Sequence, residues 1–174
     1  MGSHHTIYTV GHSTHTINEF ASILRAHGIK RLIDVRTIPR SRHNPQFNRD
    51  TLARTLRNRR INYRHMANLG GLRRPRTDSP NRAWRNLSFR GYADYMQTAA
   101  FETALQKLVL LSREKPAAIM CAEAVPWRCH RSLIADALTV HGVKVLHIHN
   151  RTIAKPHSLS KMAVVSGDRI TYPG

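Results

Sequence analysis

The sequence predicts an α/β protein: a single-domain, open three-layer sandwich built around a mainly parallel sheet. Short apolar runs of β-prone residues alternate along the chain with segments whose apolar residues recur at helical spacing, a pattern typical of this fold class. The length of 174 residues, with 41% hydrophobic and 6% aromatic residues, suits one globular domain. We expect that domain to span residues 6–174, with residues 1–5 as an N-terminal extension or the remnant of a tag.

The first elements form a strand–helix–strand unit. Residues 7–10 are β-prone, and Thr-Ile-Asn-Glu at residues 16–19 is a capping box that opens a helix. Gly28 is placed to end that helix, and the apolar residues 32–35 predict a second buried strand. Two strands joined by such a crossover are expected to be parallel.

The same signals place the remaining elements and the loops between them. They predict helices at residues 50–60, 92–98, 100–113 and 131–140, and strands at 61–66, 117–121, 143–148 and 169–172. Residues 67–90 have no periodicity, and so long an irregular segment is typical of a functional or mobile loop. Because ligands bind at the carboxyl ends of parallel strands, the candidate site consists of the loops at 11–13, 36–48, 66–74 and 122–130.

The charge of the chain indicates an anionic partner. Lysine and arginine number 28 against 10 acidic residues, a formal charge of +18, and arginine, whose fork pairs well with phosphate, predominates. We therefore expect a nucleic acid or nucleotide partner; a basic surface without a polyanionic partner is the open alternative. No apolar run approaches the ~20 residues of a membrane span, and the first residues do not resemble a secretion signal. Two cysteines form no disulfide framework, so we expect a cytoplasmic protein with free thiols.

The strongest candidate for chemistry lies between a buried strand and a helix. Reactive and charged side chains crowd into eleven positions there: Cys121, Glu123, Arg128, Cys129, His130 and Arg131. A helix N-terminus beside arginines forms an anion site, and a thiol in such surroundings becomes more nucleophilic because its pKa falls. Glu123 is the candidate general base. The alternative for Cys121 is a small buried hydrophobic residue at the end of its strand.

A metal or haem site is a weaker alternative for the same segment. The spacing of Cys121, Cys129 and His130 does not match the usual zinc pattern. A fourth ligand would have to come from one of three histidines: His12, His147 or His149. The sequence lacks a Cys-x-x-Cys-His motif, which leaves only non-covalent haem ligation by a histidine or cysteine. We therefore expect no cofactor and keep haem or a metal ion as the alternative.

A second candidate is the loop at residues 36–48, which is rich in arginine, proline and asparagine. Between Arg36 and Arg76 the chain has twelve arginines and one acidic residue. Prolines stiffen the loop, and nearby aromatic residues offer stacking surfaces, which suits single-stranded nucleic acid or an unstacked base. The expected anion-binding residues are Arg36, Arg40, Arg42 and Asn44. The arginines of the following helix fit an ordinary solvated face: Arg54, Arg57, Arg59 and Arg60.

The third candidate is the segment Gly11-His12-Ser13 at the end of the first strand. A glycine at a strand end lets the backbone approach a ligand closely. His12 is placed to transfer protons, and Ser13 to donate a hydrogen bond to a substrate. The alternative for His12 is a structural histidine whose hydrogen bonds are satisfied within the fold.

The second half of the chain resembles two enzyme classes in part. The order strand, Cys121, loop, Arg131, helix is similar to the active-site half of rhodanese-type sulfurtransferases and cysteine phosphatases. Residues 34–36, Asp-Val-Arg, are similar to a rhodanese strand. The loop is longer here and is interrupted by Pro126 and Trp127, so neither reaction is carried over.

A resemblance to one family covers nearly the whole chain. Five motifs between about residues 6 and 148 resemble the domain of unknown function 488 family: residues 9–13, 34–47, 63–71, 89–96 and 121–131. The resemblance implies a small Rossmann-like or rhodanese-like α/β domain whose strand-end residues, with Tyr92 among them, form one site. It implies no particular reaction.

These observations predict an enzyme, a transferase or hydrolase that acts on a phosphate-bearing substrate such as nucleic acid or a nucleotide. The expected catalytic residues are Glu123, His12, Cys121, Cys129 and His130. The expected substrate- or anion-binding residues are Ser13, Arg36, Arg40, Arg42, Asn44, Tyr92, Arg128 and Arg131. The alternatives are a non-catalytic nucleic-acid-binding module and a haem- or metal-binding protein that uses histidine and cysteine.

Overall fold

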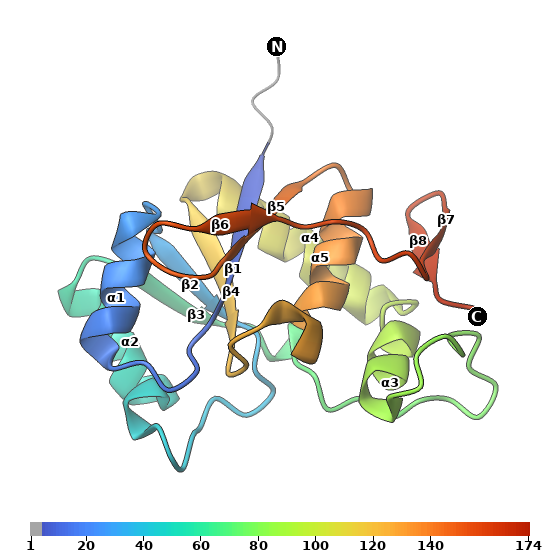
Figure 1. Cartoon of the computed structure of the whole chain (residues 1–174), viewed down its shortest axis with the longest axis horizontal. Helices are drawn as coiled ribbons and strands as arrows, with labels where there is room; N and C mark the ends of the chain where they lie inside the picture. The colour runs from blue at the N-terminus through green and yellow to red at the C-terminus, as the bar shows by residue number, and fades with distance from the viewer. Residues whose placement is uncertain (1–4) are drawn as a thin grey trace.

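A computed structural model describes residues 5–174 and shows an α/β fold with a six-stranded, mainly parallel sheet flanked by helices (Figure 1). The strands are β1 (Thr6–Gly11), β2 (Arg31–Asp34), β3 (Asn62–His65), β4 (Ala117–Cys121), β5 (Lys144–Ile148) and β6 (Ala154–Pro156). Their order is β3-β2-β4-β1-β5-β6, and only β6 pairs antiparallel, with β5. The predicted fold class is confirmed. The predicted N-terminal extension lies outside the described residues except for His5.

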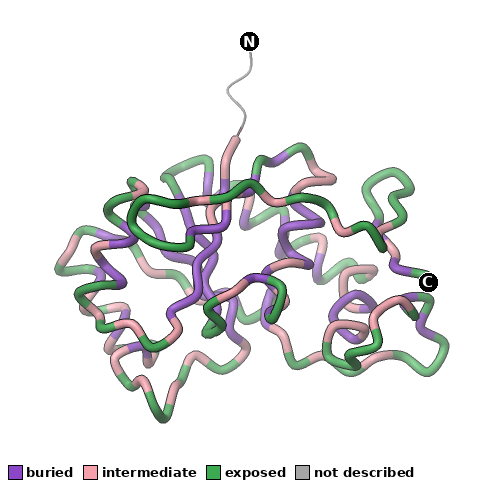
Figure 2. The backbone as a smooth tube through the Cα atoms, viewed as in Figure 1, coloured by how far each residue is buried: buried purple, intermediate pink, exposed green. Residues whose placement is uncertain are grey.

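Helices cover both faces of the sheet and form the outer two layers. They are α1 (Ile17–Ala26), α2 (Arg49–Asn58), α3 (Leu87–Tyr95), α4 (Ala99–Glu114) and α5 (Arg131–Val140). Helices α1 and α2 pack on one face, and α4 and α5 on the other. Strand β4 is buried on both faces because its side chains alternate between the two cores: Ile119 faces α4 and α5, whereas Met120 faces α1 and α2. Figure 2 shows the sheet as the buried centre of the molecule.

The predicted capping box of the first helix is confirmed. The Thr16 hydroxyl accepts a hydrogen bond from the Glu19 backbone N–H at 3.1 Å, and the Glu19 carboxylate accepts one from the Thr16 N–H at 3.2 Å. Gly28 follows the helix with φ of 69°, a left-handed conformation that suits glycine.

One sequence prediction in the middle of the chain is wrong in its bounds. The helix expected at residues 92–98 is α3, which begins earlier, at Leu87, because the Asn86 side chain accepts from the Ser88 and Phe89 N–H groups. The start was hard to predict because Gly91 is unfavourable inside a helix. Glycine is needed there because a Cβ at residue 91 would overlap the Arg73 carbonyl. The irregular segment therefore ends sooner, and it also contains a short 3₁₀ turn at Ala67–Leu69.

The C-terminal segment has more strand than the sequence predicts. The strand expected at residues 169–172 is confirmed as β8 (Arg169–Thr171), which pairs with β7 (Val164–Ser166). Strands β6 and β7 were not predicted because each has only three residues and no alternating pattern.

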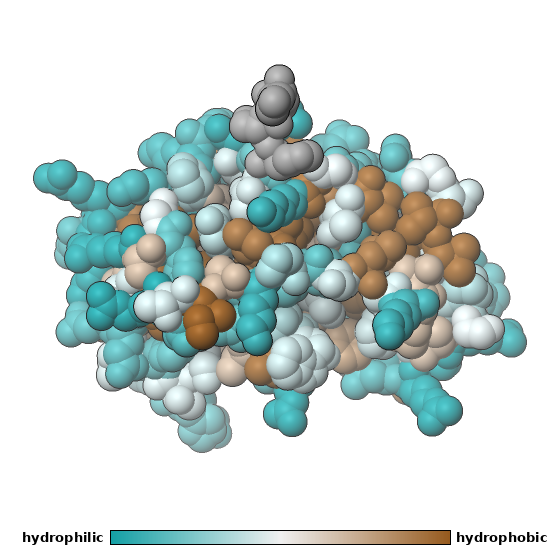
Figure 3. Space-filling model, turned by 45° about the horizontal axis from the view of Figure 1, so that its top comes forward, coloured by the Kyte–Doolittle hydropathy of each residue, from teal (hydrophilic) through white to brown (hydrophobic). Residues whose placement is uncertain are grey.

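The surface is hydrophilic over most of the face that Figure 3 presents, with apolar residues gathered on the side where β7 and β8 lie. Exposed apolar residues of the C-terminal segment are Leu159, Met162, Val164 and Val165. Within residues 5–174, the structure contains no helix of the length and apolar character needed to cross a lipid bilayer.

The carboxyl ends of β1, β2 and β4 meet at one edge of the sheet, because their registers are aligned there. Gly11 of β1 and Asp34 of β2 stand beside the last residues of β4, Cys121 and Met120. The pairing continues past the strands, since the His12 N–H donates to the Cys121 carbonyl at 2.9 Å. The segments after these three strands are therefore held side by side.

Gly11 makes this close approach possible, and its replacement tests it. A Cβ at residue 11 would overlap the backbone carbonyl of Glu123 in the loop after β4. We expect Gly11→Ala to lower the free energy of unfolding by about 1–3 kcal/mol through overpacking, as measured by denaturant titration. Gly142→Ala is the control: nothing lies within contact distance of a Cβ there, and its φ of 78° strains only the local turn. A free energy of unfolding of Gly11→Ala equal to that of the wild-type protein would contradict this role.

Candidate functional site

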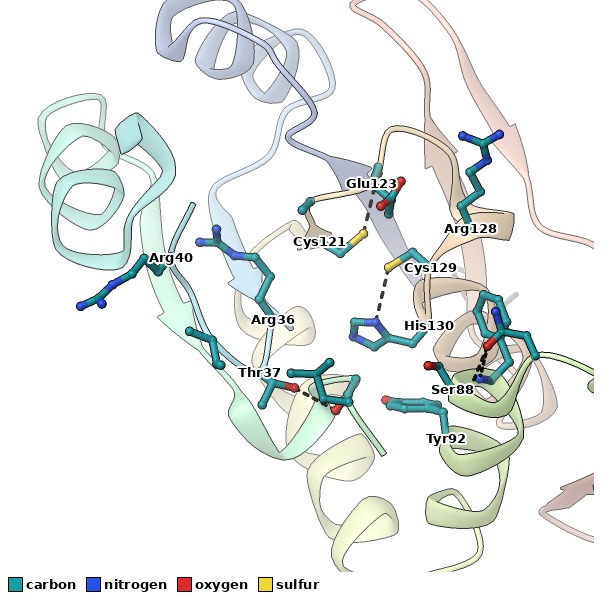
Figure 4. Close-up of a pocket in the computed structure, with 16 residues that line it drawn as sticks. Arg36, Thr37, Arg40, Ser88, Tyr92, Cys121, Glu123, Arg128, Cys129 and His130 are labelled. Atoms are coloured by element: carbon teal, nitrogen blue, oxygen red, sulfur yellow. Dashed lines mark hydrogen bonds between the residues drawn. The ribbon is translucent and has the colours of Figure 1, made fainter. Parts of the chain in front are cut away.

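A cavity of about 430 Å³ opens at the carboxyl ends of β2 and β4 (Figure 4). Its walls come from segments that are distant in sequence: the loop after β2, the irregular segment before α3, α3 itself and the loop between β4 and α5. The lining residues that the sequence predicted as functional are Arg36, Arg40, Tyr92, Cys121, Glu123, Arg128, Cys129 and His130. Their placement brings these candidates together, and their roles stay predictions.

Five predicted site residues do not line this cavity. They are His12, Ser13, Arg42, Asn44 and Arg131. His12 and Arg131 lie directly behind lining residues, as described below. Arg42 is exposed, and Asn44 contributes its backbone to the loop: its N–H donates to the Ser41 hydroxyl at 3.0 Å.

Cys121 ends β4 and presents its sulfur at the floor of the cavity. The Arg131 Nε–H donates to the Cys121 sulfur at 3.0 Å. Burial by itself would raise the pKa of the Cys121 thiol, but the neighbouring Cys129 thiol and the charge of Arg131 outweigh burial and lower it below its ordinary value. Of the two cysteines, Cys121 therefore has the surroundings that favour a thiolate.

Arg131 is the first residue of α5 and is 0% exposed. Its guanidinium turns into the fold, where it donates to the Thr9 hydroxyl at 3.1 Å and to the Glu123 carbonyl at 2.8 Å. The sequence predicted that Arg131 is a substrate- or anion-binding residue. The structure instead places it behind the cavity, where it holds the loop after β4 and faces Cys121.

Cys129 and His130 form the wall opposite Cys121. The His130 Nε2–H donates to the Val35 carbonyl at 2.8 Å, so Nδ1 carries the lone pair that faces the Cys129 sulfur at 3.4 Å. Burial lowers the pKa of His130 to about 4, which keeps the ring neutral near pH 7. Burial and the neighbouring Cys121 raise the pKa of the Cys129 thiol, so Cys129 keeps its proton.

Arg36 lines the cavity, but its charge is already neutralised. It makes a bidentate ion pair with Asp34, at 2.9 and 2.7 Å, and also donates to the Phe47 carbonyl at 2.7 Å. Tyr63 donates its hydroxyl to the same Asp34 carboxylate. Only Nη1 of Arg36 is turned toward His12, with 3.5 Å to Nε2. The Arg36–Asp34 ion pair therefore holds the loop after β2 in place and leaves little positive charge free to bind an anion.

His12 is a satisfied, buried ring. Its Nδ1–H donates to the Ser13 carbonyl at 2.8 Å, and the ring stacks on Phe47 with 4.3 Å between centroids. Burial lowers the pKa of His12 to about 4. The Ser13 N–H donates to the Ala122 carbonyl at 3.0 Å, so this segment joins the β1 end to the loop after β4. The space that Gly11 leaves is filled by the Glu123 backbone rather than by a ligand.

The rim and the apolar wall of the cavity carry the residues that can meet a substrate. Glu123, Arg40 and Arg128 are exposed at the rim, and Figure 4 shows both arginines pointing outward. Sequence reasoning missed the rest of the wall: Thr37, Ile38, Gly71, Leu72, Asn86, Ser88, Phe89 and Ala122. Five of these eight lie at residues 71–89, in the segment that the sequence marked by its lack of periodicity. Gly71 and Leu72 belong to the predicted site loop at residues 66–74, but no signal in the sequence singled out these side chains.

A buried hydrogen-bond chain runs from Arg131 away from the cavity. The Thr9 hydroxyl contacts His147 Nδ1 at 2.6 Å, and His147 Nε2 contacts His157 Nδ1 at 2.8 Å. His157 Nε2 contacts the Asp136 carboxylate at 2.7 Å, which also accepts from the Tyr172 hydroxyl. The chain connects the C-terminal segment to the back of the candidate site.

Metal ligation finds no support in the arrangement of side chains. Within residues 5–174, no group of three or more histidine, cysteine, aspartate or glutamate residues is placed to hold a metal ion. Cys121, Cys129 and His130 lie together, but the imidazole donates to a backbone carbonyl and accepts from a thiol. Both ring nitrogens are therefore engaged within the fold.

Comparison with known proteins identifies the family. A family model described as "Domain of unknown function DUF488" matches residues 16–138. The chain belongs to the DUF488 family. The match covers β2, β3 and β4 with the cysteine loop and most of α5, so the cavity lies within the DUF488 domain. No curated protein and no solved structure shows a significant match to the chain.

The buried histidines predict a pH dependence of stability. Burial lowers the pKa of His12 and His130 to about 4 and that of His147 to about 3. The unfolded chain therefore binds more protons than the folded one between about pH 6.5 and 4, so stability falls as pH is lowered through this window. Each ring contributes about 1.4 kcal/mol per pH unit at most.

Urea titrations at pH 7 and pH 5 measure this loss. His147→Gln keeps hydrogen-bonding capacity without titrating, and we expect it to reduce the loss of stability between the two pH values. His43→Gln is the matched control, because His43 is an exposed loop residue. Equal stability of the wild-type protein at both pH values would show that these histidines do not resist protonation.

Proposed function

We propose that this DUF488 protein is an enzyme that acts on a phosphate-bearing substrate, a nucleotide or a nucleic acid, with the Cys121 thiolate as its nucleophile. The observation that carries the proposal is the pairing of Cys121 with the buried Arg131 guanidinium, 3.0 Å away at the floor of an open cavity. Two further features support it: exposed arginines at the cavity rim and the formal charge of +18.

The thiolate follows from the surroundings of Arg131. A guanidinium stays charged at any ordinary pH, and a buried charge is strongly destabilising unless it is compensated. Within residues 5–174, the hydrogen-bond partners of Arg131 include no carboxylate: they are a hydroxyl, two backbone carbonyls and the sulfur of Cys121. Deprotonation of Cys121 supplies the missing counter-charge.

The cavity suits a nucleotide-sized group. Its volume of about 430 Å³ lies within the ~300–1,000 Å³ range of small-molecule sites. Ile38, Leu72 and Phe89 give it an apolar wall for a base or sugar. Arg40 and Arg128, exposed at the rim, are long enough to swing toward a phosphate, and their forked donors match its oxygens.

The chemistry would proceed in two displacements. The Cys121 sulfur attacks phosphorus, so an S–P bond forms as the P–O bond to the leaving group breaks, and the departing oxygen takes a proton from water. Water, or a second acceptor hydroxyl, then attacks phosphorus, loses its proton to Glu123 and releases the thiolate. Arg131 stabilises the sulfur as an anion in the free enzyme and again as the leaving group.

Substitutions at the two chemical groups test the mechanism. We expect Cys121→Ser to abolish turnover of a nucleotide or nucleic acid substrate, because serine is not ionised beside Arg131. Glu123→Gln should lower kcat by about 100-fold or more through loss of proton transfer. Glu114→Gln is the control, since Glu114 is a similarly exposed carboxylate that pairs with Arg31 near the opposite edge of the sheet. Undiminished activity in Glu123→Gln would remove the carboxylate from the mechanism, and undiminished activity in Cys121→Ser would remove the thiolate.

A non-catalytic nucleic-acid-binding module is the second candidate, favoured by the exposed arginines of α2, β3 and the turn between them. Arg54, Arg57, Arg60 and Arg64 are exposed and lie outside the cavity. Binding through such a face would depend on counterion release and would not involve the cysteines.

Binding measurements separate the two candidates. If the cavity holds the phosphate, Arg40→Ala combined with Arg128→Ala should weaken nucleotide binding by tenfold or more, about 1.4 kcal/mol. The matched control is Arg54→Ala with Arg57→Ala, which removes the same charge from α2. The opposite result, in which the α2 pair weakens binding and the rim pair does not, would favour the module.

A further inference from the structure

We propose that Cys121 and Cys129 form a two-thiol redox centre, which gives two electrons to a hydroperoxide and closes to an intramolecular disulfide. This is a second chemistry of the same cavity. It goes beyond the proposed phosphate chemistry and needs no phosphate-bearing substrate.

The two sulfurs face one another inside the cavity. Cys121 and Cys129 both line it, and Figure 4 shows their sulfurs pointing toward each other. Both cysteines are free thiols in this structure. Sulfurs that face each other in this way need side-chain rotation and a shift of the loop to reach the ~2 Å of a disulfide.

The segment between the cysteines can make that shift. The two residues are eight positions apart, joined by a loop whose one regular turn is the 3₁₀ turn Pro126–Arg128. Glu123, Ala124, Trp127 and Arg128 are exposed. Cys121 belongs to the central strand of the sheet, so Cys129 is the partner that moves.

The surroundings divide the roles between the two thiols. Cys121 accepts a hydrogen bond from the Arg131 guanidinium at 3.0 Å, which stabilises the thiolate that attacks peroxide. Cys129 instead keeps its proton and lies 3.4 Å from the lone pair of His130 Nδ1, which accepts its S–H and orients the sulfur. One cysteine is thus the attacking thiolate and the other the resolving thiol.

The reaction balances without a cofactor. The Cys121 thiolate attacks the terminal oxygen of the hydroperoxide, so an S–O bond forms, the O–O bond breaks, and the alkoxide or hydroxide leaves and takes a proton from water. The Cys129 sulfur then attacks the sulfur of the Cys121 sulfenic acid. An S–S bond forms, the S–O bond breaks, and the departing hydroxide takes the Cys129 proton and leaves as water. Two thiols are oxidised, and one hydroperoxide is reduced to an alcohol or water.

The experiment uses the full, reduced chain and hydrogen peroxide as the probe. Intact mass and alkylation of remaining thiols follow the reaction, and a dithiol reductant is added at the end. We expect the wild-type protein to lose both thiols together, with the mass of two hydrogen atoms, and to recover both on reduction. Oxygen atoms added without loss of both thiols, or disulfide-linked dimers in place of the intramolecular bond, would overturn the proposal.

Matched single variants assign the roles. Cys129→Ser should stop the reaction at a Cys121 sulfenic acid, which a 1,3-dione traps and excess peroxide converts to the sulfinic acid. Cys121→Ser should leave Cys129 at least tenfold slower toward peroxide, because Cys129 lacks the guanidinium contact. Equal rates in Cys121→Ser and the wild-type protein would contradict the assignment. Circular dichroism checks that each variant folds, and Cys129→Ala repeats the test without a hydroxyl.

The outcome is independent of the proposed function. A disulfide that forms in a protein without phosphate chemistry would leave this inference standing alone. A protein that turns over a phosphate substrate through Cys121 but forms no disulfide would leave Cys129 as a wall of the cavity.

Discussion

The guanidinium of Arg131 is buried behind the cavity, and much of the surrounding structure satisfies it. Its donors point to the Cys121 sulfur, the Thr9 hydroxyl and the carbonyl groups of the loop after β4. These contacts hold together the end of β4, the middle of β1 and the start of α5. A lysine there could not make this set of contacts, because its ammonium group lacks the planar fork. The path of the loop that closes the cavity therefore depends on this one side chain.

The contacts of Arg131 also set the direction of the buried hydrogen-bond chain. Because arginine only donates, the Thr9 oxygen must accept, and its own proton is free to go to His147 Nδ1. His147 Nε2–H then donates to His157, and His157 Nε2–H donates to Asp136. Each hydrogen bond in this chain therefore has one donor and one acceptor when both imidazoles are neutral. This agrees with the pKa of His147, which burial lowers. The C-terminal segment is thereby tied to the site without touching the cavity.

The sequence predicted the parts of the site that local patterns encode. The strand that ends at Cys121, the capping box before α1 and the loops at the strand ends are short-range features of spacing and residue type. The direction of the Arg131 side chain was not predictable, because an arginine at a helix N-terminus fits an exposed anion site equally well. The roles of Asp34 and Asp136 depend on partners far away in the chain. A single sequence does not show such pairings.

The wall of the cavity was missed for a related reason. Leu72, Ser88 and Phe89 lie in or next to a segment without periodicity, and they reach the cavity only because α3 begins at Leu87 and packs near α5. Gly91 made that helix hard to predict, because glycine is unfavourable in the interior of a helix. Glycine is needed at this position because the backbone of residues 73–74 passes so close that a Cβ would overlap it.

The two buried arginines at the candidate site, Arg36 and Arg131, differ in their counter-charge. Arg36 pairs with the Asp34 carboxylate, so its charge is neutralised within the fold, whereas Arg131 has no carboxylate partner and donates to the Cys121 sulfur. The formal charge of +18 therefore says little about the chemistry of the cavity floor. Exposed arginines can draw a polyanion toward the protein, because their field reaches about a Debye length into solution. In the proposed mechanism, a group that enters the cavity meets Cys121, Cys129 and His130, and the buried guanidinium of Arg131 makes the Cys121 thiol reactive.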